Sequence, residues 1–165
     1  MGTLQINSDR LWQRLNELAQ IGRIPGTDGC SRLALTQEDR QARDLVVTWM
    51  QGLGMDIVID GIGNVVGYWH GPRTDRSLPP VMTGSHIDTV RNGGRFDGNL
   101  GVLAGLEAIE RHGKAGSLRP IPCGEHGAGI LLQKQEGRWP AQSSESDQQG
   151  GNAVFERKSP RLQVG

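Results

Sequence analysis

The stretch TGSHIDTVRNGGRFDGNLGV, residues Thr83 to Val102, joins a short apolar segment to a helix-like segment through a polar loop. The segment VMTGSH that leads into it is typical of a short apolar strand. The segment DGNLGVLAGLEAIERHG that leaves it predicts a helix, with one apolar face made by Leu100, Leu103, Leu106 and Ile109. A strand, a loop and a helix in this order favour a layered α/β domain.

The segments before this stretch continue the alternation of helices and strands. One amphipathic helix is expected to begin at Asn7 or Ser8, with Leu15 and Trp12 on its inner face. A second helix is expected after Thr36, where an acidic residue three positions on completes a capping box. The segments MDIVID and NVVGYWH, joined by the turn GIGN, predict a β-hairpin. The predicted fold class is therefore α/β, within a length of 165 residues that suits one core.

The overall composition excludes several classes of partner. Lysine plus arginine and aspartate plus glutamate number 18 each, so no net charge attracts a nucleic acid or an anionic membrane. No apolar run approaches the roughly 20 residues of a membrane span, and the N-terminus has no apolar run typical of a signal peptide. Two cysteines are too few for a disulfide framework. We expect a cytoplasmic protein that binds neither nucleic acid nor membrane.

The last part of the chain has a different composition. From residue 122 to residue 165 it is rich in Gln, Ser, Gly and charged residues, with one brief apolar run from Gly129 to Leu132. Such a composition cannot bury enough apolar surface to fold alone. The sequence therefore predicts a folded part over residues 1–121 and a largely disordered tail over residues 122–165.

The loop after the predicted strand carries the candidate chemistry. His86, Asp88 and Asp97 lie within twelve residues, among the glycines at positions 84, 93, 94 and 98. Imidazole and carboxylate ligands suit zinc, manganese or cobalt, and a divalent cation would relieve the repulsion between the carboxylates. Two simpler interpretations stay open: Asp97 is a favoured helix N-cap, and His86 is a hydrogen-bonded loop histidine.

These residues also carry a resemblance. The segment GSHIDTVRNGGRFDGNLGVLAGLEAIE closely resembles the metal-binding segment of the hydantoinase/carbamoylase amidohydrolases. That family is a branch of the M20 peptidase-like hydrolases, which includes N-carbamoyl-L-amino acid hydrolases, β-ureidopropionases and allantoate amidohydrolases. The segments RLWQRLNELAQIG and GCSRLALTQEDRQARDLVVTWMQGLGMDIVIDGIGNVVGYWHG are similar to the family in order and spacing. The resemblance covers roughly Leu11 to Ile121.

The resemblance implies a three-layer zinc-peptidase-like catalytic domain with two divalent metal ions. His86 matches the family's first histidine ligand, and Asp97 matches the carboxylate that bridges the metals. Asp88 matches the catalytic aspartate that supports the histidine. The implied reaction is metal-dependent hydrolysis of a linear amide C–N bond in a small ureido or N-carbamoyl substrate, by an enzyme that forms homodimers.

Departures from the family pattern qualify this expectation. The family's next strand ends in Glu-Glu-Gly, which supplies the general base and a metal ligand, whereas here PCGEHGAGI follows LRPI and no Glu-Glu pair occurs. Gln135 and Glu136 in QKQEGRW resemble that motif but stand several residues late, and Glu125 with His126 is a further substitute pair. We therefore expect the strand and the lid and dimerisation domain to be missing. The chain would then be an N-terminal fragment, truncated or frameshifted near Ile121, with little activity; the alternative is a non-catalytic interaction module.

Overall fold

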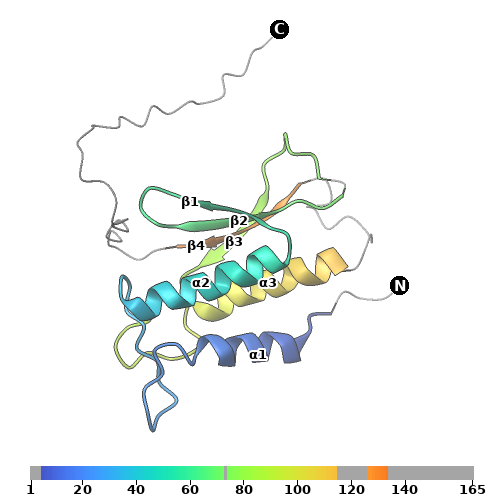
Figure 1. Cartoon of the computed structure of the whole chain (residues 1–165). Coiled ribbons are helices and arrows are strands. Elements are labelled where there is room, and N and C mark those ends of the chain that lie inside the picture. Colours follow the sequence, from blue (N-terminus) through green and yellow to red (C-terminus); the bar gives the residue numbers. More distant parts are fainter. Residues whose placement is uncertain (1–4, 73, 115–125, 134–165) are drawn as a thin grey trace, which may run out of the picture.

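The helices of this chain lie on one side of a four-stranded sheet (Figure 1). The structure is a computed structural model and describes residues 5–72, 74–114 and 126–133. Its elements, in chain order, are α1 (Ser8–Leu18), α2 (Gln37–Gly52), β1 (Asp56–Ile59), β2 (Val65–Trp69), β3 (Val81–Ser85), α3 (Asn99–Lys114) and β4 (Ala128–Leu132). Helices α2 and α3 lie next to the strands, and α1 lies beneath α3. This arrangement confirms the predicted α/β fold class.

The strands follow the order β1-β2-β4-β3. Strands β1 and β2 form the predicted antiparallel hairpin, and β4 lies between β2 and β3, antiparallel to the first and parallel to the second. The register places Ile130 beside Thr83 and Leu132 beside Ser85. The two parallel strands β3 and β4 therefore end at the same edge of the sheet.

Strand β4 corrects two expectations. The strand after α3 is present, and the expected disorder of the tail is wrong for Ala128–Leu132. The physical reason is the central position of β4 between β2 and β3. There its backbone forms hydrogen bonds with both neighbouring strands, and Ile130 and Leu132 are fully buried. Residues 122–125 and 134–165, with Glu125, lie outside the described residues, so the boundary at residue 121 stays a prediction. The described His126 contacts Pro79 through Nδ1 at 2.7 Å.

The predicted helix starts are confirmed by their caps. The side chain of Asn7 accepts a hydrogen bond from the Arg10 N–H, and the side chain of Thr36 accepts one from the Asp39 N–H. Each bond satisfies a backbone donor that has no partner inside the helix. None of the described helices is long and apolar enough to cross a membrane.

The core lies between the sheet and the helices. It is made by apolar residues of every helix, of β2 and β4, and of two connecting segments: Leu15, Leu18, Ala42, Val46, Met50, Met55, Val65, Ile87, Val102, Leu103, Leu106, Ile109, Ile130 and Leu132. Two predicted inward residues are exposed instead, Leu100 at 45% and Trp12 at 54%. Helix α3 faces both the sheet and α1, so Val102 takes the buried place expected of Leu100.

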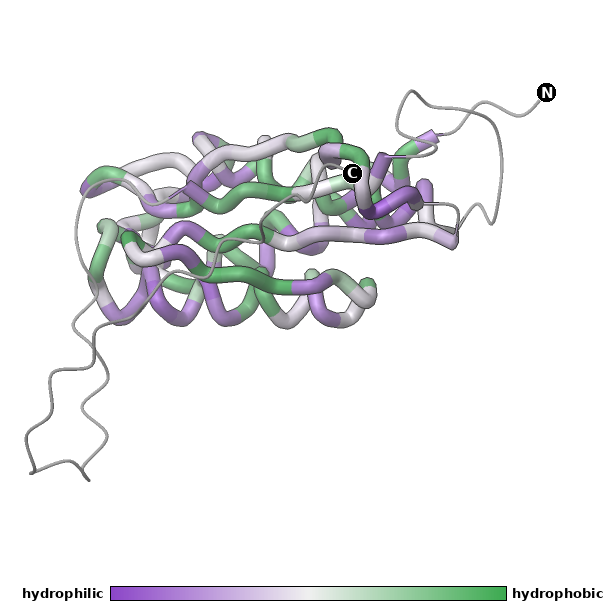
Figure 2. The backbone as a smooth tube through the Cα atoms, turned by 90° about the horizontal axis from the view of Figure 1, so that it is seen from above, coloured by the Kyte–Doolittle hydropathy of each residue, from purple (hydrophilic) through white to green (hydrophobic). Residues whose placement is uncertain are grey.

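The opposite face of the sheet has no cover among the described residues (Figure 1). Figure 2, seen from above, shows hydrophobic stretches along the strands. Met82 on β3 and Val58 on β1 are 44% and 51% exposed.

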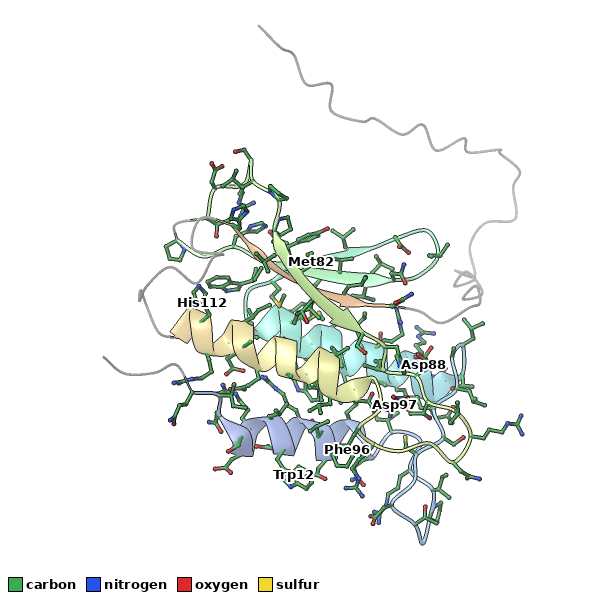
Figure 3. All side chains as sticks on the ribbon, turned by 180° about the vertical axis from the view of Figure 1, so that it is seen from behind. Trp12, Met82, Asp88, Phe96, Asp97 and His112 are labelled. Atoms are coloured by element: carbon green, nitrogen blue, oxygen red, sulfur yellow. The ribbon has the colours of Figure 1, made fainter. Side chains whose placement is uncertain are left out.

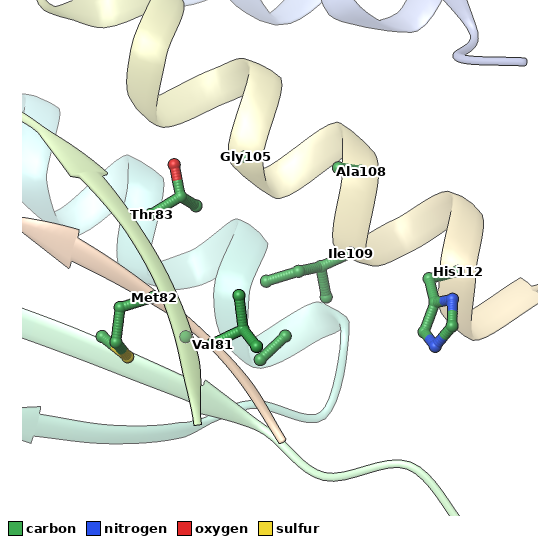
Figure 4. A pocket seen from close by; sticks show the side chains of 9 residues that line it. Val81, Met82, Thr83, Gly105, Ala108, Ile109 and His112 are labelled. Atoms are coloured by element: carbon green, nitrogen blue, oxygen red, sulfur yellow. The ribbon is translucent and has the colours of Figure 1, made fainter. Parts of the chain in front are cut away.

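An apolar groove of about 190 Å³ lies between β3 and the C-terminal half of α3 (Figure 4). In the described part of the chain, β3 is therefore an open sheet edge.

Candidate functional site

The candidate site lies at the carboxyl ends of β3 and β4. His86 follows directly after the last residue of β3, Ser85. The chain leaving β4 passes beside it, because the Gln133 N–H donates to the Ser85 carbonyl at 2.8 Å. The next residues along the chain, Gln135 and Glu136 among them, lie outside the described residues. Two segments far apart in sequence thus reach the same edge of the sheet, where α/β proteins commonly place functional groups.

The imidazole of His86 is paired with Asp88. Its Nδ1 lies 3.0 Å from the backbone oxygen of Asp88 and 3.4 Å from the carboxylate Oδ1. The side chains of His86 and Asp88 are 22% and 12% exposed. In the tautomer that carries the proton on Nδ1, the imidazole donates toward Asp88 and Nε2 stays available as an acceptor. A metal-binding histidine uses one ring nitrogen as ligand and donates from the other in this way.

Gly98 lies directly against His86 and is the residue after Asp97. Its φ of +66° belongs to the left-handed region, and a Cβ built there would lie 2.5 Å from both the His86 carbonyl oxygen and ring Cε1. A side chain at this position would displace the histidine or the helix. Figure 3 shows Asp88 and Asp97 at the same end of α3. The close approach of Gly98 to His86 therefore holds the two ends of the loop 86–98 against each other.

The other glycines of the segment divide into crowded and open positions. A Cβ at Gly84 would lie 2.8 Å from Leu131, and one at Gly93 would lie 2.9 Å from the Cβ of Thr89. At Gly94, nothing lies within 4 Å of such a Cβ. The expected close approach of the backbone is thus found at positions 84, 93 and 98 and is wrong for Gly94.

Asp97 is exposed, and its carboxylate has no hydrogen bond or ion pair within the described ranges. The first amide of α3, Asn99 N–H, donates to the backbone oxygen of Asp97 at 2.7 Å, and the Gly101 N–H donates to the Gly98 carbonyl. The interpretation of Asp97 as a helix cap alone lacks the side-chain hydrogen bond that defines a cap. Its carboxylate is available to act as a metal ligand or to accept a hydrogen bond.

The donor set fits part of a metal centre. Imidazole Nε2 of His86 and the carboxylate of Asp97 are suitable ligands for zinc, manganese or cobalt, but a catalytic zinc site uses three protein ligands. No group of three or more histidine, cysteine or acidic side chains gathers in metal-binding geometry among the residues described. The roles of His86, Asp88 and Asp97 thus stay predictions.

A buried polar cluster beneath the loop contains functional candidates that the sequence did not reveal. Arg32 is fully buried and donates hydrogen bonds to the Ile87 carbonyl and to Asn99 Oδ1. Nearby, Asp39 and Arg43 are also buried. From the sequence alone, the stretch SRLALTQED indicates only a family resemblance. The signal that could have indicated the burial of Arg32 is a charged residue close to the apolar residues Cys30 and Leu33.

Burial controls the ionisation of this cluster. Desolvation raises the pKa of the Asp39 carboxyl, although the Leu35 N–H donates to Oδ2 at 3.0 Å and the charge of Arg43 acts in the opposite direction. The other carboxylate oxygen, Oδ1, is buried and has no hydrogen-bond partner among the described residues. Desolvation also lowers the pKa of Arg32 and Arg43, and the charges of Asp39 and Asp88 oppose that shift. Asp88 is therefore electrostatically linked to the buried cluster.

Comparison with known proteins identifies the family. No protein-family model matches the chain. An N-carbamoyl-L-amino acid amidohydrolase of Geobacillus stearothermophilus is 44% identical over 117 residues, which are 71% of this chain and 28% of that protein. A ureidoglycolate hydrolase of Oryza sativa subsp. japonica is 36% identical over 111 residues, which are 67% of this chain and 22% of that protein.

A solved structure agrees with these relatives. The crystal structure of a hydantoinase/carbamoylase family amidase from Burkholderia ambifaria matches with a TM-score of 0.71 and 40% identity, over 79% of this chain and 30% of that one. The chain thus spans less than a third of the length of each of these three proteins. By sequence and by fold, this chain belongs to the hydantoinase/carbamoylase family of amidohydrolases.

Proposed function

We propose that this chain carries part of the dinuclear metal site of an amidohydrolase that cleaves the linear C–N bond of N-carbamoyl-L-amino acids. His86 and Asp97 are the metal ligands in this proposal, and Asp88 orients His86. The observation that supports it most is the close approach of Gly98 to His86 at the end of β3, because Asp97 directly precedes Gly98 in the chain.

The substrate class follows from the relatives. The protein at 44% identity is named for N-carbamoyl-L-amino acids, whereas the ureidoglycolate hydrolase is 36% identical. Both names describe small molecules with a carbamoyl or ureido group. We favour N-carbamoyl-L-amino acids for this chain, with ureidoglycolate as the second candidate. Homodimer formation and a cytoplasmic location stay predictions.

The described residues perform positioning steps of this chemistry. A bound divalent metal would polarise the ureido carbonyl and lower the pKa of a bound water. Asp88 holds the Nδ1 side of His86, so that Nε2 keeps a fixed direction. Asp97 is exposed just before α3, and in this proposal its carboxylate oxygens are the second set of ligand atoms. His86 and Asp97 would hold the metal and Asp88 would orient His86, and none of the three is proposed to accept the proton of the attacking water.

We expect little activity from this chain by itself. A positioned general base contributes about 10²–10⁴-fold to a hydrolysis rate, and the Glu-Glu pair that supplies it in the family is absent from this sequence. Two metal ligands also fall short of the three that a catalytic zinc site uses. The proposed contribution of these residues is therefore weak metal binding.

Metal titration of the purified chain tests the proposal. Zinc, manganese and cobalt(II) binding is measured by calorimetry and by elemental analysis after dialysis, for the wild type, His86→Ala, Asp97→Ala and the control Asp75→Ala. We expect weak binding that both site variants abolish and the control preserves. Binding that survives Asp97→Ala would contradict the assignment.

Activity assays test the second half of the proposal. We expect no measurable hydrolysis of N-carbamoyl-L-amino acids or ureidoglycolate by the chain alone, with or without added metal. Turnover that Asp97→Ala abolishes would confirm the site but overturn the expectation of inactivity. If Glu136→Gln abolished the same turnover, the segment QEG would act as the family's base-and-ligand motif.

The alternative proposal is a non-catalytic interaction module. The open edge of β3, with Val81 and Met82 exposed, favours it. A partner that binds the wild type and Asp97→Ala equally, but not Met82→Lys, would support the module over the metal site.

A further inference from the structure

Arg32 lies buried between three segments that meet beneath the candidate metal site. Its side chain is fully inaccessible to solvent. The neighbouring Leu18, at the end of α1, is 1% exposed. Among the described residues, no carboxylate oxygen lies within ion-pair distance of its guanidinium. A buried charge without a paired charge is costly, and its hydrogen bonds must compensate.

The guanidinium joins the three segments by hydrogen bonds. Nε donates to the carbonyl of Ile87, the residue between His86 and Asp88, at 2.8 Å. One terminal nitrogen donates to Asn99 Oδ1 at 3.0 Å, two residues after Asp97. The other donates to the carbonyls at the end of α1 and just beyond it, Leu18 at 3.0 Å and Ile21 at 2.7 Å.

The backbone of Arg32 strengthens the same junction. Its N–H donates to Thr89 Oγ1 at 2.7 Å, and the Thr89 N–H donates to its carbonyl at 2.7 Å. Two residues earlier, the Cys30 N–H donates to the Gly93 carbonyl at 2.9 Å. Residues 30–32 therefore run alongside residues 89–93. They hold the polar loop through main-chain hydrogen bonds and through the side chain of Arg32.

Asn99 carries the link from Arg32 to the start of α3. It is 1% exposed, and its Nδ2 donates to the Arg95 carbonyl at 3.1 Å while Oδ1 accepts from Arg32. The side chain thus joins the loop, the helix and the arginine. Moving Arg32 would release the turn that presents Asp97.

We propose that Arg32 is a positioning residue of the metal centre, which sets the direction of His86 relative to Asp97 by holding Ile87 and Asn99 at once. This inference rests on the proposed metal site. The planar fork of arginine supplies several N–H donors in fixed directions, whereas lysine has one nitrogen on a flexible stem. The role therefore depends on the geometry of the guanidinium, and its positive charge is not sufficient.

The test compares Arg32→Lys with Asn99→Ser and with a control arginine. Arg10→Lys is the control, because Arg10 binds the buried Glu107 of α3 and, among the described residues, makes no hydrogen bond or ion pair with the loop 86–98. Cobalt(II) affinity and the visible absorption of the bound ion are measured for each full-length chain. Mutating a residue that hydrogen-bonds to a metal ligand typically lowers the metal affinity by about 10–100-fold. We expect a loss of at least about tenfold in Arg32→Lys, a smaller loss in Asn99→Ser and none in Arg10→Lys.

Amide hydrogen exchange, followed peptide by peptide, provides a readout that needs no metal. We expect faster exchange over residues 86–99 in Arg32→Lys and Asn99→Ser, with unchanged exchange in α2 and the β1–β2 hairpin. Exchange that rises equally throughout the chain would show a general structural role and overturn the proposal. Unchanged cobalt affinity and unchanged loop exchange would also overturn it.

Two remaining outcomes are also decisive. If Arg32→Lys does not fold, Asn99→Ser decides alone, because it removes the link to α3 while the buried arginine and its other hydrogen bonds stay in place. If the wild type binds no cobalt, the proposed metal site fails, and the exchange measurement still decides whether Arg32 holds the loop.

Discussion

The two loops that flank β3 are built differently. The described residues of the loop 71–80 bond mostly to one another: Asp75 accepts from the N–H and hydroxyl of Ser77, and the Thr74 N–H donates to Gly71. The loop 86–98 bonds to distant segments instead, through Thr89 to Arg32 and through Gly93 to residue 30. Both loops connect to the same strand, so the strand does not cause the difference.

This difference indicates that the geometry of the loop 86–98 is fixed by long-range hydrogen bonds, whereas that of the loop 71–80 is not. A metal centre requires ligands that hold their directions, and hydrogen bonds to separate segments provide that constraint. A loop with local hydrogen bonds opens without disturbing the core. The loop 86–98 should therefore respond strongly to single substitutions, whereas the loop 71–80 should tolerate them.

The largest effect is expected for Gly98→Ala. The new Cβ would lie 2.5 Å from the His86 carbonyl oxygen, and the φ of +66° disfavours any L side chain. Overpacking and backbone strain together should lower the free energy of unfolding by about 2–4 kcal/mol. Urea denaturation measures this loss, and cobalt binding should disappear with it.

Gly94→Ala is the matched control in the same loop. Nothing lies within 4 Å of the added Cβ, and the φ of Gly94 is outside the left-handed region. The substitution should leave stability unchanged or raise it by about 0.4–1 kcal/mol, because alanine restricts the unfolded chain. Equal losses in the two variants would show that the contact with His86 is not the cause.

The next effect is expected for Thr89→Val. The hydroxyl of Thr89, which is 6% exposed, accepts from the Arg32 N–H at 2.7 Å and donates to the Cys30 carbonyl at 3.2 Å. Valine keeps the shape but leaves the buried Arg32 N–H unsatisfied, at a cost of about 1–3 kcal/mol. The same denaturation assay on Thr83→Val, an exposed strand residue, provides the comparison. A loss no larger than that of the control would contradict the importance of the loop's long-range bonds.

Local signals in the sequence predicted the parts of the fold that depend on local physics. Asn7 and Thr36 cap the first two helices because their side chains reach amides three residues on. The hairpin of β1 and β2 likewise follows from alternation and a short turn. The segment with His86 and Asp97 was also recognisable, because its glycines and polar residues follow a short apolar strand.

The features that the sequence did not predict depend on contacts between segments far apart in the chain. Strand β4 comes from a short apolar run in a polar tail, and only the slot between β2 and β3 makes it a buried strand. The burial of Arg32 depends equally on carbonyls contributed by α1 and by residue 87. No periodicity in the sequence encodes either arrangement, since both depend on which distant backbone groups meet.

A smaller effect, visible in its pH dependence, is expected for Asp39→Asn. Burial raises the pKa of Asp39 above its ordinary value of 3.8, so the folded state binds the proton more tightly than the unfolded state. Between 3.8 and the higher folded pKa, the folded chain holds more protons, and the contribution of Asp39 to stability falls as the pH rises. Urea midpoints measured across this window should decline in the wild type relative to Asp39→Asn. A constant difference would show that burial does not perturb this carboxyl.

The smallest effect is expected for Asp75→Ala in the loop before β3. Hydrogen bonds from the side chain and N–H of Ser77 lower the pKa of Asp75, so its contribution is present above the ordinary pKa of 3.8 and is lost as the pH falls through the folded value. Asp75 is fully exposed, and water replaces these bonds when the carboxylate is removed. We expect an unchanged melting temperature and unchanged cobalt binding, with faster proteolysis confined to residues 71–80. If Asp75→Ala weakened cobalt binding as Thr89→Val does, the two loops would be coupled through β3, and the geometry of the site would depend on the whole strand and both of its flanks.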